Sequence, residues 1–131
     1  MAKNTGKARD PIKWVRDRAK SAYVKADCCA ICGTSEDLEF HHYNSLTELF
    51  EKWARINSLP ITTDDEVVAI RDRFISEHHE ELYEKAVTLC NKHHMALHKL
   101  YGIKPPLSTA AKQERWVKIQ AEKHELKKLA N

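Results

Sequence analysis

The stretch that decides the fold is TLCNKHHMALH, residues 88–98, in which two residues separate Cys90 from His93. A second pair with the same spacing, Cys29 and Cys32, lies in the segment CAICG. Two such pairs can supply four ligands to one tetrahedral ion, and a set of three cysteines and one histidine suits structural zinc. A chain of this size gains considerable stability from such an ion. The spacing therefore predicts a zinc site that joins two distant parts of the chain.

Two alternatives remain open for this cluster. His94 follows His93 directly and is able to replace it as the fourth zinc ligand. In a simpler interpretation, Cys90 is an ordinary buried thiol and the cysteines at 28–32 are a chance cluster. Three residues separate Cys28 from Cys32, which is one more than in the metal-binding pair, so Cys28 is interpreted as a cysteine that does not bind the ion.

The histidines next to these pairs have a spacing of their own. His94 and His98 are four residues apart, which on a helix places both rings on one face. His41 and His42 are adjacent in the segment LEFHHY, residues 38–43, and on a strand their side chains point to opposite sides. One of the two can therefore join a metal ion while the other acts as a general base.

The remaining chain is predicted to be mostly helical around a small sheet. Capping signals precede apolar residues at helical spacing, while two short stretches have the character of strands. The predicted strands are 38–43 and 86–89, and the predicted helices are 11–26 after Asp10, one after Ser45, one after Thr63, 91–100 ending before Gly102, and one from Ser108 to about 129. The predicted fold class is α+β.

Composition limits the class of protein. The chain has 131 residues, which suits one domain, and no apolar run approaches the roughly 18 residues that a membrane span needs. The N-terminal residues lead into no apolar stretch, so we expect a cytoplasmic protein without a membrane partner.

The charged side chains are unevenly distributed along the chain. Residues 1–27 hold 8 basic and 3 acidic side chains, and residues 86–131 hold 9 basic and 3 acidic ones, whereas residues 48–85 hold 5 basic and 10 acidic ones. The two basic ends suit contact with phosphate, although solvated helix faces have the same composition.

The joint pattern of CAICG, LEFHHY and TLCNKHHMALH resembles the HNH endonucleases, also called ββα-metal or His-Me finger nucleases. The resemblance covers residues 28–43 and 87–101. It implies a small ββα-metal core held together by a structural zinc ion, with flanking and inserted helices. The whole chain would be a single nuclease domain, which divides into a basic N-terminal helix 1–27, the core 28–43 and 86–102, a helical insertion 44–85 and a basic C-terminal helix 105–131.

The same resemblance implies roles for individual residues. His42 would be the general base, and His41 would be the metal ligand at the first position of the doublet. His94 and His98 would complete the ligands of a catalytic divalent ion. Glu39, two residues before the doublet, would orient a ligand or approach the metal.

The implied activity is that of a metal-dependent DNA endonuclease, of phage or bacterial origin, which hydrolyses phosphodiester bonds with one divalent ion. Mg²⁺ is the expected ion, and histidine ligands also accept other divalent metals. DNA is the expected partner, bound by a monomer or a homodimer, with Lys92, Lys99 and Lys104 as expected DNA contacts. The alternatives are a non-catalytic zinc module that binds nucleic acid and a zinc-stabilised protein-interaction domain, neither of which needs the second set of histidines.

Two departures from the family pattern are present. Family members usually carry cysteine at the position of His93. The middle asparagine of the family name, which steadies the loop that bears the base, is expected a few residues before Cys90, where Lys85 stands. Asn44 and Asn91 are the candidates to replace it.

Overall fold

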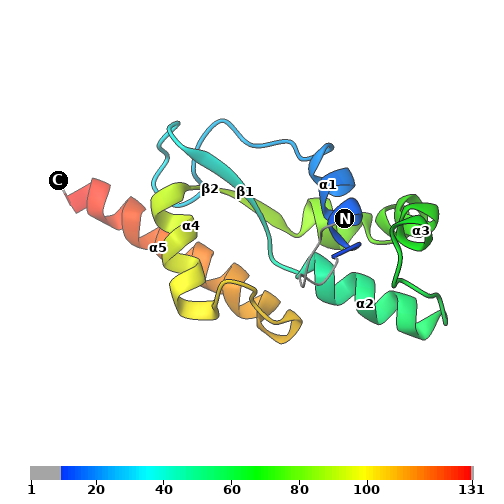
Figure 1. Cartoon of the computed structure of the whole chain (residues 1–131). Helices are drawn as coiled ribbons and strands as arrows, with labels where there is room; N and C mark the ends of the chain where they lie inside the picture. The colour runs from blue at the N-terminus through cyan, green and yellow to red at the C-terminus, as the bar shows by residue number, and fades with distance from the viewer. Residues whose placement is uncertain (1–9, 131) are drawn as a thin grey trace, which may run out of the picture.

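The structure, a computed structural model, describes residues 10–130 as a mostly helical α+β protein with one two-stranded sheet (Figure 1). This confirms the predicted fold class. In chain order the elements are α1 (Lys13–Lys20), β1 (Leu38–His42), α2 (Leu46–Ile56), α3 (Asp64–Glu77), the π-helical turn η1 (Glu80–Glu84), β2 (Ala86–Cys90), α4 (Asn91–Tyr101), the 3₁₀ turn η2 (Leu107–Thr109) and α5 (Ala110–Ala130).

The sheet and α4 form a ββα unit. β1 and β2 are antiparallel, with Leu38 opposite Cys90 and His42 opposite Ala86. Each strand lies within one residue of its predicted end. α4 begins at the residue after β2 and packs against both strands, which brings the helical histidines beside those of β1. Gly102, with a φ of 97°, ends α4 as predicted, because this backbone conformation suits glycine best.

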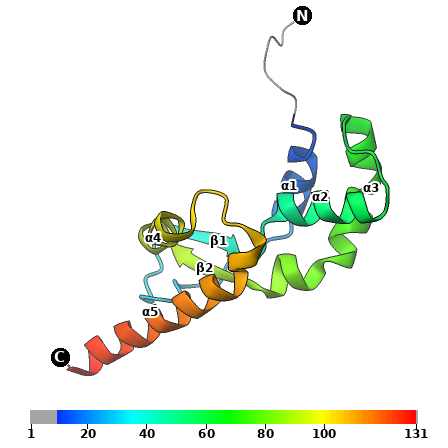
Figure 2. The ribbon, with the colours of Figure 1, turned by 90° about the horizontal axis from the view of Figure 1, so that it is seen from below.

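Two separate apolar cores stabilise the chain. The first belongs to α1, α2, α3 and η1, which we call the helical lobe, and is centred on Phe50 and Phe74. The second joins the ββα unit to the cysteine segment and α5, which we call the ββα lobe, and includes Leu89, Leu97 and Val117. Figure 2 shows α1, α2 and α3 grouped at one end of the molecule, with α4 and α5 at the other. A pocket between the two lobes is therefore lined by residues of both lobes.

The first helix is shorter than predicted. The sequence predicts helix over 11–26, whereas α1 ends at Lys20. Beyond it the chain leaves the helix, and the ring of Tyr23 stacks on Phe40 of β1 with 4.1 Å between centroids. This long-range aromatic packing outweighs local helix propensity. The N-cap position of α1 is Ile12 and not Asp10, whose carboxylate pairs with Arg16 and has a hydrogen bond with the backbone of Ile12.

The remaining capping predictions have mixed outcomes. Thr63 and Glu66 form the complete predicted capping box at the start of α3. Ser45 caps α2 as predicted, but the carboxylate of Glu48 accepts a hydrogen bond from the N–H of Leu107, at the start of η2. Ser108 lies inside η2 and does not cap the last helix. Among the helices described in residues 10–130, none has the length and apolar character needed to cross a membrane.

Candidate metal centres and active site

Three cysteines and His93 converge at the junction of the cysteine segment, β2 and α4. Their ligand atoms all lie within 4.8 Å of one another. The Sγ atoms of Cys32 and Cys90 are 3.9 Å apart, and Nδ1 of His93 lies 3.3 Å from Sγ of Cys90 and 3.9 Å from Sγ of Cys29. A tetrahedral zinc ion with ordinary bond lengths places sulfur atoms about 3.8 Å apart, and sulfur about 3.6 Å from nitrogen. The donors and their separations therefore fit a metal ion in this cluster.

The backbone prepares Cys29 for this role. Burial alone raises the pKa of its thiol, but hydrogen bonds from the backbone N–H groups of Cys32, Cys90 and Ile31 outweigh burial and lower the pKa. A lowered pKa favours the thiolate, which is the form that binds metal. Cys28 is exposed and lies outside the cluster.

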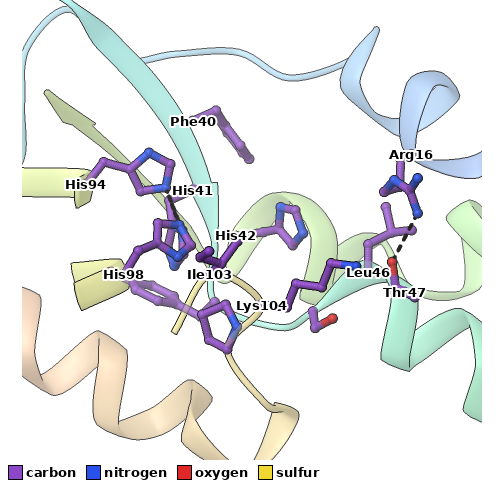
Figure 3. A pocket seen from close by; sticks show the side chains of 13 residues that line it. Arg16, Phe40, His41, His42, Leu46, Thr47, His94, His98, Ile103 and Lys104 are labelled. Atoms are coloured by element: carbon purple, nitrogen blue, oxygen red, sulfur yellow. Dashed lines mark hydrogen bonds between the residues drawn. The ribbon is translucent and has the colours of Figure 1, made fainter. Parts of the chain in front are cut away.

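A second group of ligand atoms comes from His41 of β1 and from His94 and His98 of α4 (Figure 3). Nε2 of His94 lies 3.1 Å from Nδ1 of His41 and 3.0 Å from Nε2 of His98. A divalent ion bound at about 2.1 Å in octahedral geometry separates neighbouring ligand atoms by about 3.0 Å. These two separations fit neighbouring ligand positions around one ion, and all three ligand nitrogens lie within 4.8 Å of one another.

The two histidines of α4 have their other ring nitrogen fixed by an acceptor. Nδ1 of His94 lies 2.7 Å from the carboxylate of Glu39, whose second oxygen accepts a hydrogen bond from the side chain of Asn91. Nδ1 of His98 lies 2.8 Å from the carbonyl oxygen of Gly102. Since both partners only accept, each Nδ1 carries the proton and each Nε2 keeps a free lone pair. Such outer partners are typical of metal-binding histidines.

His41 has a matching partner in Gln113 of α5. The Gln113 amide oxygen lies 2.8 Å from Nε2 of His41, and its NH₂ group donates to the carbonyl of Tyr43 and the hydroxyl of Thr109. The Tyr43 carbonyl can only accept, so the amide orientation is fixed, and with it the proton on Nε2 of His41. Sequence reasoning missed Gln113, which is fully buried. Its spacing of four residues from Val117 is the one signal that places it on the inner face of α5.

Burial keeps the strand histidines neutral. It lowers the pKa of His41 to about 3, against the opposing effect of the Gln113 hydrogen bond, and it lowers the pKa of His42 to about 4. Both rings are therefore neutral at pH 7 and can bind a metal ion or accept a proton. The hydrogen bond to His94 is the main cause of the lowered pKa of Glu39, which stays ionised.

His42 lies beside the histidine cluster and has a different partner. Its Nδ1 is 3.1 Å from the hydroxyl of Tyr23, which comes from the segment between α1 and β1. The sequence places Tyr23 in the predicted first helix, so this contact was missed. Asn91, one of the two candidates for the missing family asparagine, bonds to Glu39 and does not contact His42 through any hydrogen bond in the described chain.

One pocket of about 370 Å³ contains both His42 and the three clustered histidines. It lies between the lobes, and its opposite wall carries Arg16 of α1 and Thr47 of α2 (Figure 3). Of the three lysines expected to contact DNA, Lys104 lines this pocket, while Lys92 and Lys99 are exposed on α4 outside it. The remaining lining residues are Phe40, Tyr43, Ser45, Leu46, Ile103 and Pro105.

The sequence of the chain matches a known protein family over almost its whole length. The model of the nicking endonuclease family, whose name refers to phage T5, matches residues 1–127. The chain belongs to the nicking endonuclease family. No solved structure matches it. As a member of this phage family, the chain is a DNA endonuclease, and its substrate is DNA.

The site of this nicking endonuclease brings together the residues that the sequence singled out. The four expected zinc ligands form one group and the three expected histidine ligands form the other, each able to hold a metal ion. The structure places His93 in the group with the cysteines and His94 in the group with the histidines. Glu39 contacts the histidine group through His94 and is not itself part of it.

Proposed function

We propose that this chain is a metal-dependent endonuclease of the HNH type, which nicks DNA with His41, His94 and His98 as ligands of one catalytic divalent ion. The observation that carries the proposal is the completeness of the outer partners. Each of the three rings has one nitrogen against an acceptor, which leaves the other nitrogen unprotonated, and these three free nitrogens lie within 4.8 Å of one another. Histidines that merely fill a core have no need of this arrangement.

In this proposal His42 is the general base. Its ring lines the same pocket, and burial holds its pKa near 4, so it is unprotonated at pH 7. The tautomer that fits has Nδ1–H donating to the oxygen of Tyr23, which leaves Nε2 free to take a proton from the attacking water. The products of this hydrolysis carry a 5′ phosphate and a 3′ hydroxyl.

The divalent ion, when bound, supplies positive charge to the scissile phosphate and to the leaving 3′ oxygen. The protein's part is to keep its ligands in one tautomer and one orientation. Glu39 and Gln113 do this from opposite sides, the first through His94 and the second through His41. Mg²⁺ accepts octahedral geometry but prefers oxygen ligands, whereas three imidazole nitrogens suit transition-metal ions, so we propose that the site accepts divalent transition ions as well as Mg²⁺.

The cysteine cluster has a structural role in this proposal, with zinc as its ion. It joins Cys29 and Cys32 of the cysteine segment to Cys90 at the end of β2 and His93 in the first turn of α4. It therefore fixes the start of the helix that carries two of the catalytic ligands. No cysteine lies in the lining of the catalytic pocket.

Conversion of supercoiled plasmid to the nicked form tests the proposal. We expect wild-type protein to nick with Mg²⁺ or Mn²⁺ and not with a mild chelator. His42→Ala is expected to keep its zinc and its affinity for Mn²⁺ but to lose 10²–10⁴-fold in rate, which is roughly the contribution of a general base. His98→Ala is expected to lose Mn²⁺ affinity as well. His79→Ala, at an exposed histidine of the helical lobe, is the matched control and should nick normally.

The opposing outcomes are distinct. A wild-type protein that binds plasmid but leaves it intact in every divalent metal would make the chain a non-catalytic zinc module that binds nucleic acid. If His42→Ala nicks as fast as wild type while His98→Ala does not, the metal site stands and the general base has been assigned to the wrong residue.

A further inference from the structure

The catalytic pocket has a second, positively charged end that the proposed chemistry does not use. Arg16 of α1 and Lys104 of the segment between α4 and α5 line it opposite the histidine cluster (Figure 3). Nη1 of Arg16 donates to the hydroxyl of Thr47 on α2 at 3.3 Å, and Nη2 pairs with the carboxylate of Asp10. The guanidinium is thus held by neighbours on two sides while its side chain remains 38% exposed. It is positioned in advance and still accessible.

The guanidinium of Arg16 already binds one anion, the carboxylate of Asp10, which lies beside it but is not part of the pocket lining. Its pKa is lowered first by the hydrogen bond from Arg16, and also by a hydrogen bond with the backbone of Ile12 and by the positive charge of Lys104. Two cationic side chains and a backbone group therefore act on one oxygen-bearing anion. A phosphodiester oxygen has the same charge and accepts the same hydrogen bonds.

We propose that Arg16 and Lys104 form a second phosphate subsite, which binds a backbone phosphate of the DNA strand that is cut, next to the scissile phosphate. This inference rests on the proposed function, since the scissile phosphate is placed at the histidine cluster. The planar fork of an arginine suits a phosphate, and one pocket joins the two ends. In the free protein Asp10 neutralises Arg16, and bound DNA takes its place.

A phosphate contact of this kind positions the strand without reading its sequence. The histidine cluster and the subsite would hold two phosphates of one strand and thereby orient it across the pocket. Arg16 is contributed by the helical lobe and the metal ligands by the ββα lobe. The helical lobe then takes part directly in substrate binding.

Arg18 offers a matched control for Arg16. Both lie on α1 and each pairs with an aspartate, but Arg18 contacts Asp72 of α3 and lies outside the pocket lining. Replacing either by alanine removes one positive charge and one exposed ion pair from the same helix. Differences between the two variants therefore report the position of the side chain and not net charge or stability.

The test is binding of a fluorescent duplex oligonucleotide, measured by anisotropy over a series of salt concentrations without added divalent ion. For Arg16→Ala we expect the slope of log K against log salt to fall by about 1, with binding about tenfold weaker at low salt and equally so for unrelated sequences. For Arg18→Ala we expect the wild-type slope. Lys104 lies in an exposed segment, and we expect Lys104→Ala to show the same fall in slope and the same weaker binding. This variant replaces Arg16→Ala in the test if circular dichroism shows that Arg16→Ala is misfolded.

Equal slopes for Arg16→Ala and Arg18→Ala would overturn the subsite, as would a wild-type slope for Lys104→Ala. Nicking of plasmid by the wild-type protein, measured in parallel, separates this failure from that of the proposed function. If wild type nicks and the Arg16 and Arg18 variants bind alike, the function stands and the subsite is wrong. If wild type never nicks but the slopes differ as expected, the phosphate site stands and the nuclease mechanism is wrong.

Discussion

Gln113 offers the sharpest test of the site, because its side chain is fully buried and makes three hydrogen bonds. Replacing it with leucine keeps a similar volume but removes the acceptor for Nε2–H of His41. That ring is then free to place its proton on Nδ1, the nitrogen directed at the metal. Loss of an outer partner typically lowers metal affinity or activity 10–100-fold, which corresponds to about 1.4–2.7 kcal/mol.

The variant also has a cost in stability. The N–H of His41 and the carbonyl of Tyr43 lose their Gln113 partner inside the protein, at about 1–3 kcal/mol for each buried group left unpaired. Gln113→Glu is the matched variant, since a carboxylate at that position still accepts from His41. We therefore expect Gln113→Glu to keep more of the Mn²⁺ affinity than Gln113→Leu does, although both lose the bond to Tyr43.

The assay is Mn²⁺ titration by calorimetry, with zinc content and urea unfolding measured on the same samples. Zinc should be unchanged in both variants, because the cysteine cluster does not involve Gln113. Mn²⁺ affinity within twofold of wild type in Gln113→Leu would refute the reasoning, because the proton on His41 would then not depend on this amide.

Three further predictions concern acid stability, the cysteine cluster and the general base. Because burial lowers the pKa of His41 to about 3, the unfolded chain binds its proton first as the pH falls below about 6.5, and stability is lost from there toward pH 3. Urea unfolding without added divalent ion should show a fall of up to about 1.4 kcal/mol per pH unit from His41, to which His42 adds a similar fall down to pH 4, and a flat profile between pH 7 and 5, with zinc retained, would contradict the prediction. Cys29→Ser should lose the bound metal and melt at least 10 °C lower, roughly the effect of a few kcal/mol on a domain of this size, whereas the exposed Cys28→Ser should match wild type in metal analysis and thermal melting. Tyr23→Phe should lower kcat about tenfold with unchanged KM and zinc, the equivalent of one lost hydrogen bond to the base, while Tyr83→Phe, whose hydroxyl bonds to a backbone carbonyl of α1, leaves kcat unchanged. Equal kcat in these two tyrosine variants would count against the role of Tyr23.

The parts of the site that could be predicted are those with a local spacing. His94 and His98 are four positions apart on α4, so helix geometry places them together, while Cys90 and His93 have the two-residue spacing of a metal knuckle across the start of that helix. For His41, the prediction that residues 38–43 form a strand was enough, because neighbouring side chains of a strand point to opposite faces and so separate His41 from His42. These ligands therefore follow from the residues and from the family resemblance, and the α+β fold with a small sheet follows from the same segments.

The residues that were missed act across long separations in the chain. Gln113 meets His41 across 72 positions and Thr47 meets Arg16 across 31, so no spacing in the sequence indicates either contact. Tyr23 was placed in a helix because its neighbours have helix propensity, whereas its ring packs on β1. Tertiary packing decides all three, and a single sequence contains no direct record of it.

His93 and His94 are consecutive residues on one helix, yet they belong to different metal groups. In the proposed enzyme this arrangement links the two ions thermodynamically. An ion at the cysteines would fix the rotation of α4 about its axis, and with it the direction of His94, so we expect it to raise the affinity of the histidine group for the catalytic ion. Linkage is reciprocal, so in this proposal the catalytic ion in turn raises the affinity of the cysteine cluster for its ion. For the proposed enzyme we therefore expect that a chain without an ion at the cysteines holds the catalytic ion weakly and nicks DNA slowly.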